Sequence, residues 1–145
     1  MEPEACATRA GLRARIIVAA DRASPAQVKK IIDRFSAIQA AIDSGESAVD
    51  EDFAFHCAIA TATGNPQFTR FLEYLGRFII PRRSIWKDAD LAERRIQLDI
   101  FQKEHEQIVQ AIQAGAVSQA RAAMQRHLLN SRQRYQKLAA EHSIK

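Results

Sequence analysis

The sequence predicts an all-α protein, an antiparallel bundle of six to seven helices, and three observations support this fold class. Apolar residues recur at the three- and four-residue spacing of amphipathic helices, and no segment shows the alternation of a half-buried strand. The 145 residues include only five glycines and four prolines, and these fall at regular distances between the apolar segments. The length fits one domain, so residues 1–145 are expected to form a single unit.

The first two helices are expected over residues 4–20 and from Ser24 to Gly45. In the first, apolar residues recur along one face. In the second, Ser24 fits the N-cap and Pro25 fits the first helical position, where its missing N–H has no partner to lose. The inner face of this helix is expected to consist of Val28, Ile31, Ile32, Phe35, Ile38 and Ile42.

A third and a fourth helix are expected in the middle of the chain. The third begins near residues 47–50 and ends at Thr63, because the Gly-Asn-Pro sequence that follows favours a helix end. The fourth carries apolar residues from Phe68 onward and is expected to kink or end at Pro81. A polar connection is expected over residues 82–90.

The last two helices are expected to be longer. One is predicted over Leu91–Ala114, ended by Gly115, and the other over about Val117–Ala140. The inner stripe of the first of these is expected to consist of Leu98, Phe101, His105, Ile108 and Ile112.

Charge and hydropathy exclude several classes of protein. The 21 basic and 17 acidic residues leave a net charge of +4, too small and too dispersed to indicate a nucleic-acid surface. The longest apolar run, residues 16–20, is far shorter than the roughly 20 residues that span a bilayer. The N-terminus has no apolar signal segment, and Cys6 and Cys57 are isolated. We therefore expect a cytoplasmic protein with reduced thiols and no membrane partner.

The histidines are the strongest functional signal. Asp52 and His56 lie one helical turn apart, while His105 and His127 fall on the inner faces of two other helices. Each such residue alone is typical of a hydrogen-bonded core residue, but four buried polar groups all need partners. One divalent cation would satisfy all of them, and this donor set suits zinc, nickel, iron or manganese. The fourth histidine, His142, is expected in a polar, exposed tail.

Known catalytic motifs do not occur in the sequence. The Glu-x-x-His pairs of di-iron bundles, HExxH, GxSxG and a glycine-rich phosphate loop are all missing. A binding protein without enzymatic activity is therefore favoured. Two alternatives stay open: a helical-bundle metalloenzyme, a lyase or hydrolase acting on an organic acid, and a metal-free dimerisation bundle.

Three blocks of sequence resemble a known family. Residues 52–56, Asp-Phe-Ala-Phe-His, followed by Gly64-Asn65, resemble the D-x-x-F-H…G-N signature of the FCD domain. That domain is the C-terminal, effector-sensing half of FadR-subfamily GntR transcriptional regulators. Residues 104–112, followed by Gly115, Ala120 and His127, resemble the family's E-H-x-x-I-x-x-A-I block, and Arg9 matches an arginine of its first helix. The resemblance covers essentially the whole chain.

The resemblance implies a FadR C-terminal-domain-like bundle with one divalent transition metal, zinc being favoured. The implied metal ligands are Asp52, His56, His105 and His127. The metal is expected at the base of a pocket for a small organic-acid or sugar-acid effector. Guanidinium groups suit carboxylates, so the expected effector-binding residues are Arg9 and Arg83, with Trp86 and Asn130 lining the pocket.

The resemblance also implies a role in transcription regulation. A homodimer is expected, which would bind DNA only through an N-terminal winged helix-turn-helix domain that is absent from this chain. The chemistry expected of the chain is coordination and charge pairing, with no enzymatic reaction.

Overall fold

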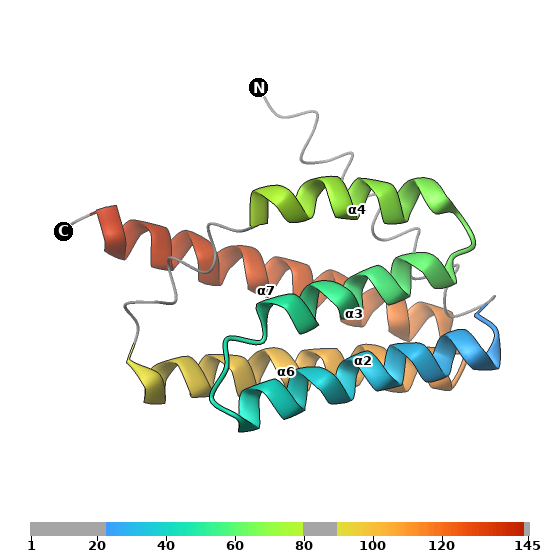
Figure 1. Cartoon of the computed structure of the whole chain (residues 1–145), viewed down its shortest axis with the longest axis horizontal. Coiled ribbons are helices and arrows are strands. Elements are labelled where there is room, and N and C mark those ends of the chain that lie inside the picture. The colour runs from blue at the N-terminus through green and yellow to red at the C-terminus, as the bar shows by residue number, and fades with distance from the viewer. Residues whose placement is uncertain (1–22, 80–89, 144–145) are drawn as a thin grey trace.

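The computed structural model describes residues 23–79 and 90–143, and within these ranges every regular element is a helix, so the predicted all-α fold class is confirmed. The helix predicted over residues 4–20 lies outside the described residues. The five helices, shown in Figure 1, are α2 (Pro25–Asp43), α3 (Val49–Ala62), α4 (Pro66–Ile79), α6 (Leu91–Gln113) and α7 (Val117–Ser143).

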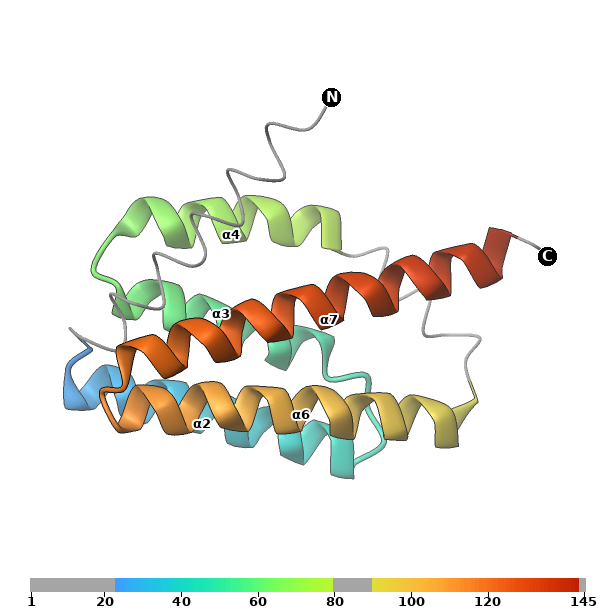
Figure 2. The same ribbon diagram turned by 180° about the vertical axis from the view of Figure 1, so that it is seen from behind.

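The helix pairs that pack most extensively on one another run antiparallel (Figure 1). The main contacts link α4 to α3, α3 to α2, α2 to α6 and α6 to α7. Figures 1 and 2 show α2 and α6 side by side, with α4 at the opposite edge of the bundle. As a result α3, α6 and α7 surround a common interior, although they are far apart in the sequence.

The start of α2 follows the local sequence as predicted. Ser24 Oγ accepts a hydrogen bond from the Gln27 backbone N–H, and the Gln27 side chain accepts one from the Ser24 backbone N–H. This reciprocal capping box satisfies two backbone donors that the first turn leaves without helical partners. Pro25 occupies the first helical position, and Gly45 follows the helix with a φ of +77°.

The end of α2 is tied to α6 by an arginine. Arg95 donates to the Ile42 carbonyl oxygen at 3.2 Å and to the Asp43 carboxylate at 2.9 Å. A cation at the C-terminus of a helix is favourable, because the last carbonyl groups carry a partial negative charge. The contact fixes the position of α6 along the axis of α2. It therefore also fixes where along α2 the inner face of α6 lies.

The predicted helix ends agree with the structure to within a few residues. Pro66 begins α4 beyond the α3 end at Ala62, with residues 63–65 between them, and Asn65 Oδ1 accepts a hydrogen bond from the Gln67 N–H at its start. The last helix extends to Ser143, three residues past the predicted Ala140. Helix ends fray, so differences of this size are ordinary.

The core lies between α2, α3, α6 and α7. Its largest fully buried apolar side chains include Ile31, Phe55, Ile108 and Met124. The predicted inner face of α2 is confirmed, since its apolar residues are either buried or packed against this core. Among the described helices, none has the length and apolarity needed to cross a membrane.

Candidate metal centre

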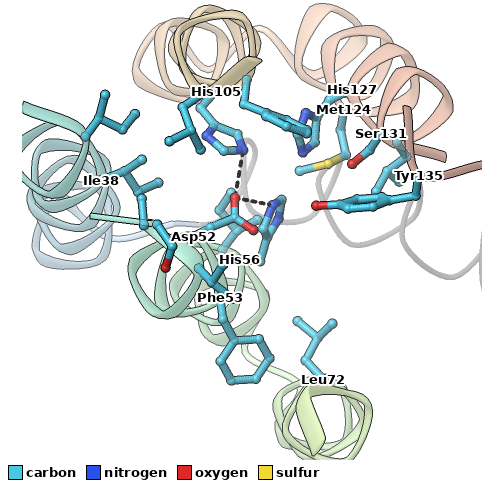
Figure 3. Close-up of a pocket in the computed structure, with 18 of the residues that line it drawn as sticks. Ile38, Asp52, Phe53, His56, Leu72, His105, Met124, His127, Ser131 and Tyr135 are labelled. Carbon is cyan, nitrogen blue, oxygen red and sulfur yellow. Dashed lines mark ion pairs between the residues drawn. The ribbon is translucent and has the colours of Figure 1, made fainter. Parts of the chain in front are cut away.

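The three inward histidines meet at the centre of the bundle. His56 lies on α3, His105 on α6 and His127 on α7, and each offers a ring nitrogen within 4.8 Å of the others. Asp52, one turn before His56 on α3, points into the same space (Figure 3). The structure therefore brings together the four residues that the sequence proposed as metal ligands. Their role as ligands stays a prediction.

Asp52 supplies the anionic group of the cluster. Its Oδ1 lies 3.2 Å from His105 Nε2 and 3.6 Å from His56 Nε2, the two ion pairs drawn in Figure 3. Burial opposes the ionisation of Asp52, but its attraction to His56 and His105 outweighs burial and holds its pKa well below the usual value. Asp52 is therefore negatively charged at neutral pH.

His105 is the most deeply buried member, with 1% of its surface exposed. Its Nδ1 lies 3.4 Å from Gln102 Oε1, and Gln102 is itself anchored because its Nε2 donates to the Phe35 carbonyl oxygen at 3.0 Å. Burial lowers the pKa of His105, so the imidazole is neutral at pH 7 and fit to bind a metal. Its other nitrogen, Nε2, makes no hydrogen bond within the described part of the chain.

His127 is oriented by Glu104, which lies on α6 next to His105. His127 Nδ1 lies 2.8 Å from Glu104 Oε2, and an ionised carboxylate can only accept, so Nδ1 carries the proton. Nε2 of His127 is then the nitrogen available to a ligand. Burial lowers the pKa of His127 to about 4, although the Glu104 hydrogen bond opposes this shift. The ring is neutral at pH 7.

Glu104 is held by three partners on α7. Besides His127, it accepts hydrogen bonds from Asn130 at 2.8 Å and from Arg134 at 2.7 and 3.0 Å. Burial raises the pKa of Glu104, but these hydrogen bonds outweigh it and bring the pKa to about 2. A partly buried, ionised carboxylate thus fixes one face of α7 against α6.

The donor set fits a divalent transition metal. Three imidazoles and one carboxylate, held by three different helices, are the ligand types of zinc, nickel, iron and manganese sites. The buried Nε2 of His105 has no hydrogen bond to lose on binding a cation. Gln102 and Glu104 hold the opposite nitrogens of two rings, an arrangement that sets the orientation of metal-binding histidines.

A cavity of about 170 Å³ opens beside the cluster and is lined by all four candidate ligands. Its walls come from all five helices and include Ile38 of α2, Phe53 of α3 and Leu72 of α4. Figure 3 shows Ser131 and Tyr135 of α7 on the side of the cavity near His56 and His127. The cluster therefore faces a space large enough for a small molecule.

Of the four predicted effector-binding residues, the structure describes one. Arg9, Arg83 and Trp86 lie outside the described residues. Asn130 is described, and it donates to Glu104 instead of contributing to the described cavity wall. An effector-binding role for each of the four stays a prediction.

Sequence reasoning missed the residues that support the histidines. Glu104 is the sequence neighbour of His105, so the two side chains leave α6 in different directions, and that of Glu104 leads to His127. Gln102 lies one turn before His105 on α6, and its side chain reaches His105 Nδ1. The signal for the network is present in α7, where His127, Asn130 and Arg134 follow one another at the spacing of a single helix face.

Comparison with known proteins agrees with this architecture. Residues 4–130 match the model of the FCD domain family. The chain is 30% identical over 117 residues to the HTH-type transcriptional regulator LutR of Bacillus subtilis (strain 168). The aligned residues make up 78% of this chain and 52% of LutR. This chain therefore spans about half the length of this curated relative. The solved structure of E. coli McbR/YncC has a TM-score of 0.75 at 16% identity, covering 93% of this chain and 62% of that one, and shows the same fold. The chain therefore belongs to the FCD domain family, as its sequence motifs predicted.

Proposed function

We propose that this chain is the effector-sensing domain of a GntR-family transcriptional regulator. It would bind one divalent transition metal through Asp52, His56, His105 and His127, and a small carboxylate in the adjoining cavity. The observation that carries the proposal is the convergence of three imidazoles and an ionised carboxylate at the wall of that cavity. The metal would supply a positive charge to one carboxylate oxygen of the effector.

Residues of the chain would orient the metal ligands and balance the charge of the metal. Gln102 and Glu104 hold two of the imidazoles in fixed orientations, and Asp52 balances part of the metal's charge. The apolar residues of the described wall lower the local dielectric constant, which strengthens charge pairing inside the cavity. Because the candidate ligands come from α3, α6 and α7, occupancy would bias the packing of three helices together. In a homodimer this bias would change the placement of two DNA-binding domains.

Two features support a sensor over the enzymatic alternative. Asp52 is the single carboxylate in the described cavity wall, and it is paired with His105. Glu104, which is next to His105 in the sequence, is engaged by His127, Asn130 and Arg134. A general base would need a carboxylate or imidazole free to reach the substrate. Nε2 of His105 is buried without a hydrogen bond although the Asp52 carboxylate lies 3.2 Å from it, and a cation held by both groups would satisfy it, which disfavours a purely structural, metal-free bundle.

Thermal unfolding with and without ligands tests this function. The chain is first treated with a chelator and then loaded with Zn²⁺, and a panel of small carboxylic acids is added to both forms. We expect Zn²⁺ to raise the melting temperature, and an acid to raise it further only in the loaded form, because ligands that bind the native state stabilise it. Equal stabilisation of both forms by the acid, or no effect of any divalent metal, would contradict the proposal.

The DNA-binding part of the proposal has a separate test. We expect this chain alone to bind duplex DNA no more tightly than a nonspecific contact, with a dissociation constant of about 10⁻⁴ M or weaker at physiological salt. The net charge of +4 is small for a DNA-binding surface. Sequence-specific binding by the isolated chain in a mobility-shift assay would show that DNA contact belongs to this domain itself.

A further inference from the structure

The described wall of the cavity beside the candidate ligands is markedly apolar. Apart from the four candidate ligands, the described wall consists of twelve apolar residues and three with hydroxyl groups, Ser47, Ser131 and Tyr135. Figure 3 shows Ile38, Phe53 and Leu72 around the Asp52–His56 side of the cluster. Within the described wall the ionisable groups Asp52, His56, His105 and His127 are therefore concentrated at one place, where an acid group would bind.

The size of the cavity limits the rest of the ligand. A volume of about 170 Å³ is close to that of an engineered apolar cavity of about 150 Å³ that holds one benzene molecule. It is smaller than the cavities of about 300 Å³ or more that bind drug-sized ligands. A body of about six carbon atoms would fill it.

The chemistry of the wall disfavours a heavily hydroxylated ligand. Each hydroxyl taken from water into an apolar wall without a partner costs free energy. A six-carbon sugar acid such as gluconate carries five hydroxyls, more than the hydroxyl side chains that the described wall offers. A hydrocarbon body of the same length gains from burial against the same wall.

From this we infer that the effector is a monocarboxylic acid with a compact apolar body of about six carbons, which excludes the sugar acids. The inference rests on the proposed function, since it assumes that the cluster holds a metal that anchors the acid group. The narrowing from small carboxylic acids in general to apolar ones comes from the residues that line the described cavity wall.

Titration of the Zn²⁺-loaded chain with matched acids tests the inference. Hexanoate and gluconate are both six-carbon monocarboxylates and differ in their hydroxyls. We expect hexanoate to bind at least about tenfold more tightly. In the series acetate, butanoate and hexanoate, each added methylene is expected to tighten binding about fourfold until the cavity is full. The metal content is measured after each titration, because gluconate itself can chelate metals.

A pair of variants tests the location of the apolar body. Leu72 lies half-buried in the cavity wall on α4 and outside the main core, so Leu72→Asn is expected to fold. It should weaken hexanoate binding about tenfold, because it places an amide in the apolar wall, and it should leave the metal content unchanged. Leu129→Asn, on α7 and 38% exposed, makes the same chemical change away from the cavity and should have no effect.

The outcomes separate the inference from the proposed function. Gluconate binding as tightly as hexanoate to a chain that keeps its Zn²⁺ would overturn the inference and leave the proposed function intact. A loaded chain that binds neither acid would overturn the inference and the carboxylate part of the proposed function. Failure to load any metal would overturn both.

Discussion

Nδ1 of His127 donates a hydrogen bond to Glu104 at 2.8 Å, and this contact decides which ring nitrogen is left for a metal ion. Glu104 is the sequence neighbour of His105, yet the two side chains leave α6 in different directions, because neighbours on a helix point about 100° apart. His105 enters the cluster, while Glu104 reaches α7. One helix therefore supplies a candidate ligand and the support for another.

Glu104→Gln is expected to weaken metal binding by about 10- to 100-fold. The amide keeps the shape of the side chain but removes the negative charge that makes His127 a better ligand and that pairs with Arg134. Competition with a coloured chelator measures the affinity. Glu106→Gln, an exposed position on the same helix, is the matched control and should bind metal like the unmodified chain. Unchanged affinity in both variants would show that Glu104 has no part in metal binding.

The stability of the metal-free chain is expected to fall as the pH drops from about 6.5 to about 4. The pKa of His127 is about 4 in the folded chain against an ordinary value of 6.5, so the unfolded chain takes up the proton first. This difference removes up to about 3 kcal/mol of the free energy of unfolding across the window. His105, whose pKa is also lowered, acts in the same direction.

Glu104 extends this loss of stability to lower pH. The pKa of Glu104 is about 2 in the folded chain against an ordinary 4.5. Its contribution to the free energy of unfolding is therefore complete above pH 4.5 and is lost progressively as the pH falls toward 2. Urea unfolding at about pH 7, 5.5 and 4.5 measures the profile. His127→Gln should flatten the upper part of the profile. A free energy of unfolding that stays constant from pH 7 to pH 4.5 would contradict the burial of neutral histidines.

Tyr135→Phe is expected to weaken carboxylate binding about fivefold to tenfold without loss of metal, the ordinary size of one hydrogen bond. Figure 3 shows the Tyr135 hydroxyl directed toward the His56 side of the cavity, where an acid group would lie. Calorimetric titration of the Zn²⁺-loaded variant with hexanoate gives the affinity. Tyr74→Phe, an exposed position on α4, makes the same change elsewhere and should bind as before. If Tyr135→Phe also loses metal, Tyr135 supports the cluster and not the effector.

Ser24→Ala is expected to lower the free energy of unfolding by about 1 kcal/mol. It removes the side-chain oxygen that accepts from the Gln27 N–H at the start of α2. Ser36→Ala, exposed in the middle of the same helix, should be neutral or slightly stabilising, because alanine favours helix. Urea unfolding distinguishes the two variants. Metal binding should be unchanged in both, since neither position touches the cluster.

Local sequence determined the helices well. Ser24 and Pro25 marked the start of α2, and Gly64 and Gly115 marked helix ends because their backbones adopt positive φ. The inward histidines could also be predicted, since their place on a helix face follows from the spacing of nearby apolar residues. These features depend on residues within one or two turns of each other, and one sequence is enough to find them.

Features that depend on which helices are neighbours could not be predicted. Glu104 finds His127 only because α6 packs on α7, and Gln102 reaches the Phe35 carbonyl only because α6 also packs on α2. Asn130 was expected in the effector pocket, and the same packing turns it toward Glu104. The apolar wall of the cavity is likewise assembled from all five helices and has no signature in any one segment.

Metal content is the most direct test of the account, because every functional step depends on the cluster. The chain and its Asp52→Asn and His105→Ala variants are dialysed against equal concentrations of Zn²⁺, Ni²⁺, Mn²⁺ and Fe²⁺, and bound metal is counted by mass spectrometry. Asp50→Asn, an exposed neighbour on α3, is the control. We predict one metal ion per chain in the unmodified protein and the control, and loss of most of it in both variants. No bound metal in the unmodified chain, or equal metal in all four proteins, would contradict the account.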